Sequence, residues 1–113
     1  MIDLKNLTIK KAHEGFKNKE FTCRELLEEY LKVIREKNKE LNVYLEVFKD
    51  VIEQAERADK KFADGSATLM TGIPVAIKDN ILFKGHKVSS GSNILRNYIA
   101  AYNSTVIQKL RDA

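Results

Sequence analysis

A short apolar run that ends in a lysine places the strongest constraint on the fold of this sequence. The stretch GIPVAIKDN contains consecutive apolar residues before Lys78, and after Pro74 they predict a short buried strand, 75–78. A buried parallel strand needs neighbouring strands, and parallel neighbours need long crossover connections. The chain offers only two other short candidates, 43–48 and 86–88. We therefore expect the opening part of a larger α/β protein; the alternative is a compact α+β domain with antiparallel strands.

Helical patterns dominate the chain before this strand. The expected helices cover about residues 8–17, 22–38 and 51–64. The second begins at a capping box formed by Thr22 and Glu25 and carries a continuous apolar stripe. The third follows a similar pair, Asp50 and Glu53, and Gly65 is suited to end it because glycine readily adopts the left-handed conformation.

The residues after the predicted buried strand favour loops and one more helix. A turn leads into the candidate strand 86–88, a Ser-Gly loop covers 89–92, and 93–97 is compatible with one helical turn. Asn103 or Ser104 is expected to cap a final helix. Its apolar period is still running at Ala113, without a Gly or Pro stop signal.

Composition excludes several classes of function. The net charge is +4, but Lys and Glu are interspersed, which is typical of solvated helix faces and not of a phosphate-binding stripe. No apolar run is long enough for a membrane span or a signal peptide. The single cysteine, Cys23, is expected to be a small buried apolar residue in a reducing cytoplasm. His13 has no ligand-type neighbours, so we expect it to be half-buried or exposed and not to bind a metal.

Lys78 is the one candidate for chemistry. A lysine acts as a base only when it is neutral, and burial favours the neutral form. Asp79 would oppose this if its carboxylate pointed toward the amine. From the residues alone, a surface or salt-bridged lysine is the simpler interpretation. The serines of 89–92 lack the strand–turn–helix context of a nucleophile elbow and are expected to form a loop.

The lysine segment and its flanks resemble the amidase signature family. GIPVAIKDN is similar to the family's lysine segment, roughly G-[IV]-P-[VIF]-x-[VI]-K-D. Residues 7–47 resemble its N-terminal pair of helices and following strand, and residues 85–113 resemble a stretch with T-T-x-G-S and T-V-[VI]-x-x-L-[RK]-x-A. The chain departs from this pattern with Ser89-Ser90 where Thr-Thr is usual. Within the family, the resemblance is greatest to the amidase subunits of tRNA-dependent amidotransferases.

The resemblance implies a Ser–cis-Ser–Lys mechanism with Lys78 as the general base. In this mechanism the lysine takes the proton of a nucleophilic serine through a bridging serine. The family's Gly-Ser tract, which carries both serines, has no match in these 113 residues. We therefore expect an N-terminal fragment of the family's mixed-sheet fold, with a helical part at about 1–64 and the start of the catalytic sheet at about 70–113. The isolated chain is expected to be inactive.

The resemblance also implies substrates and partners. The complete enzyme would take ammonia from glutamine and work with a partner subunit that binds tRNA, in the cytoplasm. ATP and Mg belong to that partner's step, so no cofactor is expected in this chain. Two alternatives stay open: a stand-alone amidase of the same family, and a short non-catalytic protein that docks on partner subunits.

Apolar faces without a sheet to cover them lead to one more expectation. Val75, Ile77, Ile107 and Leu110 would be exposed in a chain that lacks the rest of the sheet. Bare apolar patches and open strand edges tend to pair. We therefore expect the chain to self-associate.

Overall fold

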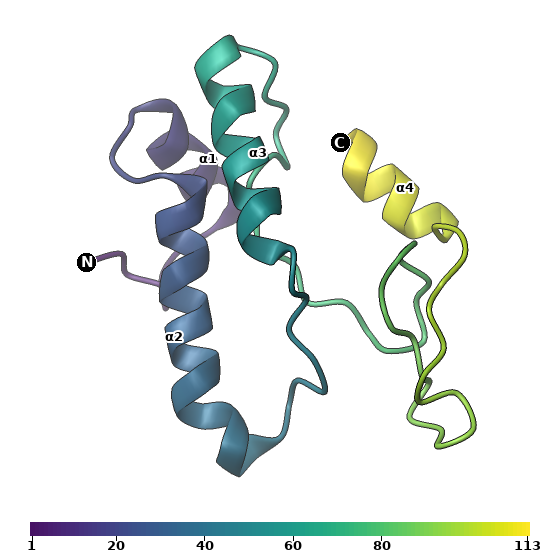
Figure 1. Cartoon of the computed structure of the whole chain (residues 1–113). Helices are drawn as coiled ribbons and strands as arrows, with labels where there is room; N and C mark the ends of the chain where they lie inside the picture. Colours follow the sequence, from purple (N-terminus) through teal and green to yellow (C-terminus); the bar gives the residue numbers. More distant parts are fainter. The chain divides into compact units, whose positions relative to one another are not determined.

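The computed structural model describes residues 1–113 and contains four α-helices in two compact units (Figure 1). The first unit, Met1–Pro74, contains α1 (Ile9–Lys17), α2 (Cys23–Leu41) and α3 (Val51–Asp64), and the second, Val75–Ala113, contains α4 (Thr105–Asp112). None of these helices is both long and apolar enough to cross a membrane.

Side-chain caps start the first two helices, and the cap of α2 is the one that the sequence predicts. The Thr8 hydroxyl accepts a hydrogen bond from the backbone N–H of Lys11 at 3.2 Å and starts α1. At α2, the N–H of Glu25 donates to the Thr22 hydroxyl at 3.0 Å, and the Glu25 carboxylate accepts from the N–H of Thr22 at 2.8 Å. These reciprocal bonds confirm the predicted capping box. The helix ends at Leu41, beyond the expected end near Asn38.

The core of the first unit is built from the apolar faces of α1, α2 and α3. α2 and α3 pack against each other (Figure 1). The buried apolar residues of this core come from all three helices: Ala12, Phe16, Cys23, Leu26, Leu27, Ala55 and Ala58. The Phe16 ring contacts Phe21 edge-on, with ring centroids 5.4 Å apart. The buried interior combines small side chains with the Phe16 ring.

A carboxylate from α3 completes the cap of α2. Asp59 accepts hydrogen bonds from the backbone N–H groups of Cys23 at 2.7 Å and Arg24 at 3.2 Å. The Arg24 guanidinium also pairs with Glu56 at 2.6 Å. The first turn of a helix has N–H groups without partners inside the helix, and a carboxylate there is favourable for both its charge and its lone pairs. Asp59 therefore ties the two helices together.

The predicted strand 43–48 is wrong, because this segment is irregular. Within this segment, the Asn38 side chain hydrogen-bonds the backbone of one residue, Tyr44, as a neighbouring strand would. Its amide donates to the backbone C=O of Tyr44 at 2.8 Å, and its oxygen accepts from the N–H of Tyr44 at 2.8 Å. An alternating pattern makes a segment suitable for a sheet, but a strand forms only when a second extended segment pairs with it. No such segment lies beside 43–48.

The two ends of α3 differ in how well the sequence predicts them. The predicted pairing of Asp50 and Glu53 is wrong, because Asp50 makes no side-chain cap hydrogen bond. Its carboxylate accepts from the Gln54 side chain at 3.1 Å instead. Gly65 ends the helix in the left-handed conformation, with φ of 77°, as predicted.

The second unit has little regular structure before α4. The predicted strand 75–78 is wrong, since these residues are irregular, and Val75 is 51% exposed. The predicted strand 86–88 is reduced to one isolated antiparallel bridge between Lys87 and Ile99. The chain therefore forms no mixed sheet, because the neighbours that a buried strand requires are missing.

The last helix forms as the sequence predicts. Ser104 is its N-cap, and the hydroxyl accepts from the N–H of Ile107 at 3.4 Å. Asn103, the other candidate cap, instead accepts from the N–H of Lys84 at 2.8 Å. Ile107 is buried, as are Val88 and Ala100, which corrects the expectation that Ile107 would be exposed.

Candidate active-site segment

The candidate base, Lys78, lies on the surface of the second unit. Its side chain is exposed, and no hydrogen bond or ion pair involves its ammonium group. The backbone turns directly after it, since the N–H of Ile81 donates to the C=O of Lys78 at 3.0 Å. The lysine is therefore presented at a turn and not buried at a strand end. In this chain Lys78 is a surface lysine, which is the simpler interpretation from the residues alone.

Asp79, next to this lysine, is bound by a loop that follows later in the sequence. Its Oδ1 accepts from the backbone N–H of Ser89 at 3.0 Å. Its Oδ2 accepts from the N–H of Gly91 at 3.1 Å and from the Ser89 hydroxyl. The backbone C=O of Asp79 accepts from the N–H of Ser90 at 2.8 Å. The Asp79 carboxylate is thus occupied by the loop and makes no ion pair with Lys78.

These hydrogen bonds also set the charge of Asp79. The Ser89 hydroxyl is the largest influence, and with the N–H groups of Ser89 and Gly91 it holds the pKa of the Asp79 carboxyl below its usual value. The positive charge of Lys87 acts in the same direction. Asp79 is therefore an anion at neutral pH. The sequence suggests only Lys78 as a partner of Asp79. The feature that could have indicated the observed partners, Ser89 and Gly91, is the small polar loop with a glycine at 89–92.

The serines of this loop are structural in the chain as it stands. The Ser89 hydroxyl donates to Asp79, and the Ser92 hydroxyl accepts from the N–H of Ile94 at 3.2 Å. No hydrogen bond connects a serine hydroxyl to Lys78 or to a histidine that could activate it. The prediction that 89–92 is a loop is confirmed.

Cys23 and His13 of the first unit carry no comparable arrangement. Cys23 is fully buried, as predicted, and burial together with the neighbouring Asp59 raises the pKa of its thiol. The thiol therefore stays protonated and unreactive. The His13 ring packs against Phe62 with centroids 5.5 Å apart, and its Nδ1 is buried without a hydrogen-bond partner. Across the chain, no group of three or more His, Cys, Asp or Glu side chains could hold a metal ion.

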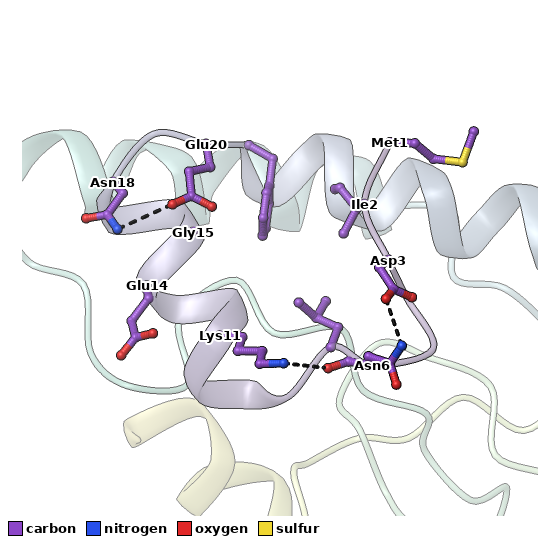
Figure 2. A pocket seen from close by; sticks show the side chains of 11 residues that line it. Met1, Ile2, Asp3, Asn6, Lys11, Glu14, Gly15, Asn18 and Glu20 are labelled. Carbon is purple, nitrogen blue, oxygen red and sulfur yellow. Dashed lines mark hydrogen bonds between the residues drawn. The ribbon is translucent and has the colours of Figure 1, made fainter.

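A shallow pocket of about 500 Å³ lies between the N-terminal segment and α1 (Figure 2). Several of its polar groups bond to one another: the Asn6 amide donates to Asp3 at 2.8 Å, and the Lys11 ammonium donates to the C=O of Asn6 at 3.3 Å. Asn18 also faces Glu20 at 3.5 Å. The pocket contains no nucleophile beside a base, so it supports no catalytic chemistry.

Comparison with known proteins identifies the family. The family model described as Amidase matches residues 25–113. A glutamyl-tRNA(Gln) amidotransferase subunit from Thermoanaerobacter pseudethanolicus is 38% identical over 110 residues, covering 96% of this chain and 22% of the relative. The protein of the same name from Acinetobacter baumannii is 39% identical over 114 residues, covering 100% of this chain and 23% of the relative. The chain thus spans less than a quarter of the length of these relatives. Because the matched region includes most of the chain, the protein belongs to the amidase family.

Proposed function

We propose that these residues form part of the amidase subunit of a tRNA-dependent amidotransferase. The complete subunit would release ammonia from glutamine for the amidation of Glu-tRNA(Gln) or Asp-tRNA(Asn). The observation that carries the proposal is Lys78, which lies inside the family match with an exposed amine that no carboxylate neutralises. The relatives, which are glutamyl-tRNA(Gln) amidotransferase subunits by name, favour this reaction over hydrolysis of other amides.

Lys78 would act as the general base of the Ser–cis-Ser–Lys site that the family resemblance implies. Its neutral amine accepts a proton from a bridging serine, which takes the proton of the nucleophilic serine. The nucleophile attacks the side-chain amide carbon of glutamine, and ammonia leaves with a proton returned along the same path. Water then hydrolyses the acyl-enzyme to glutamate. An amine without an ion-pair partner suits this role, because an adjacent carboxylate would stabilise the charged form.

Both serines of this site would come from sequence other than the 113 residues. The serines near Lys78 in sequence are engaged in the 89–92 loop. In the complete domain, 75–78 would gain strand neighbours and become part of a mixed sheet, which would cover the exposed Val75. ATP and Mg would be used by the partner subunit that binds tRNA, and the chain itself would hold no cofactor.

The test uses the polypeptide that contains the complete amidase domain, assayed for ammonia release from glutamine with its partner subunits. We expect Lys78→Ala to lower kcat/KM at least about 100-fold, the usual contribution of a positioned general base. Lys84→Ala is the matched control, because Lys84 is an exposed lysine of the same unit whose side chain has no bonding partner. Full activity of the Lys78→Ala enzyme would disprove the proposed role.

The same assays separate this function from its alternatives. Turnover of simple amides without dependence on partner subunits or tRNA would indicate a stand-alone amidase. The 113-residue chain by itself is expected to show no glutaminase activity. Activity of that chain which disappears in Lys78→Ala would show that the missing serines are not needed, and binding to partner subunits without any turnover in the complete domain would indicate a docking role.

A further inference from the structure

The loop that follows Lys78 closes on Asp79 through four contacts. Ser89 supplies two of them, its N–H and its hydroxyl, both to the carboxylate. The N–H of Gly91 binds the carboxylate as well, and the N–H of Ser90 binds the backbone C=O of the same residue. Every contact is made to the residue directly after the candidate base. The loop therefore fixes both the backbone and the charge beside Lys78.

The backbone of the loop is shaped for this purpose. Ser90 and Gly91 both have positive φ, 51° and 66°, an arrangement that glycine adopts freely and serine rarely. Successive N–H groups in such conformations converge on one point and form a concave site for an anion. Here the anion is the Asp79 carboxylate of the chain itself. The loop thus binds an internal carboxylate as other loops bind a phosphate.

The consequence concerns Lys78. Asp79 is the adjacent carboxylate in the sequence, and a free carboxylate there could turn to pair with the ammonium. Such a pair stabilises the charged form of lysine and opposes its action as a base. Lys87 lies just before the 89–92 loop. Its positive charge also attracts the Asp79 carboxylate toward the loop. Neither lysine forms an ion pair with it.

We propose that Asp79 and Ser89 are positioning residues that act through Lys78. The 89–92 loop holds the Asp79 carboxylate away from the Lys78 amine and so keeps that amine available for proton transfer. The value of this for catalysis rests on the proposed function. The physical claim, that Ser89 controls which group Asp79 interacts with, can be measured on the chain itself.

The first experiment follows the titration of the Lys78 amine in the 113-residue chain by NMR. In Ser89→Ala, the carboxylate loses its strongest partner and can reach the ammonium, so the titration midpoint should move to higher pH. An exposed pair of this kind is expected to shift it by about 0.2 to 0.7 pH unit. Ser89→Thr retains a hydroxyl and should titrate as the native chain does. Ser90→Ala is the matched control, because the Ser90 hydroxyl makes no hydrogen bond while its N–H is retained.

The double variant Asp79→Asn with Ser89→Ala decides the cause. It lacks the carboxylate, so the upward shift should disappear even though the loop is loosened to at least the same extent. A shift that persists in this double variant would come from loop disorder, and it would overturn the proposal. An unchanged midpoint in Ser89→Ala alone would overturn it too.

The second experiment connects the loop to turnover in the complete amidase domain. The acid limb of kcat/KM against pH reports the protonation of the base, so it should move to higher pH in Ser89→Ala and not in Ser89→Thr. Full activity of Lys78→Ala would disprove the proposed function while leaving the NMR result intact. An inactive Lys78→Ala enzyme with an unshifted limb in Ser89→Ala would disprove only the positioning role.

Discussion

Gly72, the first residue of the lysine segment, is required by a close approach in the core of the first unit. Its φ is +78°, in the left-handed region where residues with a Cβ are strained. A Cβ built at this position would lie 2.2 Å from Sγ of Cys23 and 3.3 Å from the Phe16 ring. The backbone that leads to Lys78 is therefore packed directly against the buried thiol. This packing explains the glycine of GIPVAIKDN without reference to catalysis.

Gly72→Ala is expected to destabilise the first unit by about 2 kcal/mol or more, through left-handed strain and overpacking. Urea denaturation followed by circular dichroism would measure the change. Cys23→Ala removes the sulfur that the new methyl would meet, at a cost of about 1 kcal/mol by itself. The double variant should be clearly more stable than the sum of the two changes predicts. Strict additivity would show that the contact with Cys23 does not limit this position.

At the scale of elements, the contact of α3 with the start of α2 organises the first unit. The cap of α2 is partly local, from Thr22 and Glu25, and partly distant, from Asp59 on α3. The distant part joins residues 36 positions apart in the sequence. It therefore couples the formation of the cap to the packing of the two helices, which a local capping box cannot do.

Asp59→Ala should lower the free energy of unfolding of the first unit by about 2 kcal/mol, because it leaves the N–H groups of Cys23 and Arg24 without their acceptor. Asp59→Asn retains one acceptor oxygen but no charge and should cost less. Glu53→Ala is the control on the same helix, since its pair with Arg57 is long, at 4.0 Å, and exposed. Equal effects of Asp59→Ala and Glu53→Ala on the urea midpoint would contradict this account.

For the whole molecule, the sequence predicts the features that depend on interactions between residues close together in the chain. The starts of α1, α2 and α4 depend on a hydroxyl and N–H groups within the next turn, and these predictions are confirmed. The strands 43–48 and 75–78 depend on partners elsewhere, so an apolar pattern alone could not establish them. The contacts of Asp59 and Asp79 could not be predicted either, because they join residues 36 and 10 positions apart. The residues single out Lys78 and the family resemblance predicts its role as a base, which stays a prediction; the contacts around it required the structure.

The same distinction sharpens the expectation of self-association. Val75 and Leu110 are exposed, at 51% and 36%, as expected, whereas Ile107 is buried and Ile77 is partly buried. In the first unit, Val43 and Leu45 are 66% and 67% exposed on an irregular segment without strand pairing. In the second, Ile94 is 94% exposed. Exposed apolar residues on a segment without regular pairing can be covered by another copy of the chain.

We expect the sedimentation coefficient of the 113-residue chain to rise with protein concentration as copies associate through 43–47. Leu45→Lys should weaken this association, because it places a charge on the exposed apolar side of that segment. Glu46→Lys is the matched control, since it introduces the same residue next to it and leaves the apolar side chains intact. If both variants behave alike, net charge and not the apolar surface governs association. A native chain that sediments as a monomer at every concentration would exclude association through 43–47. The apolar side chains of that segment would then remain exposed to solvent.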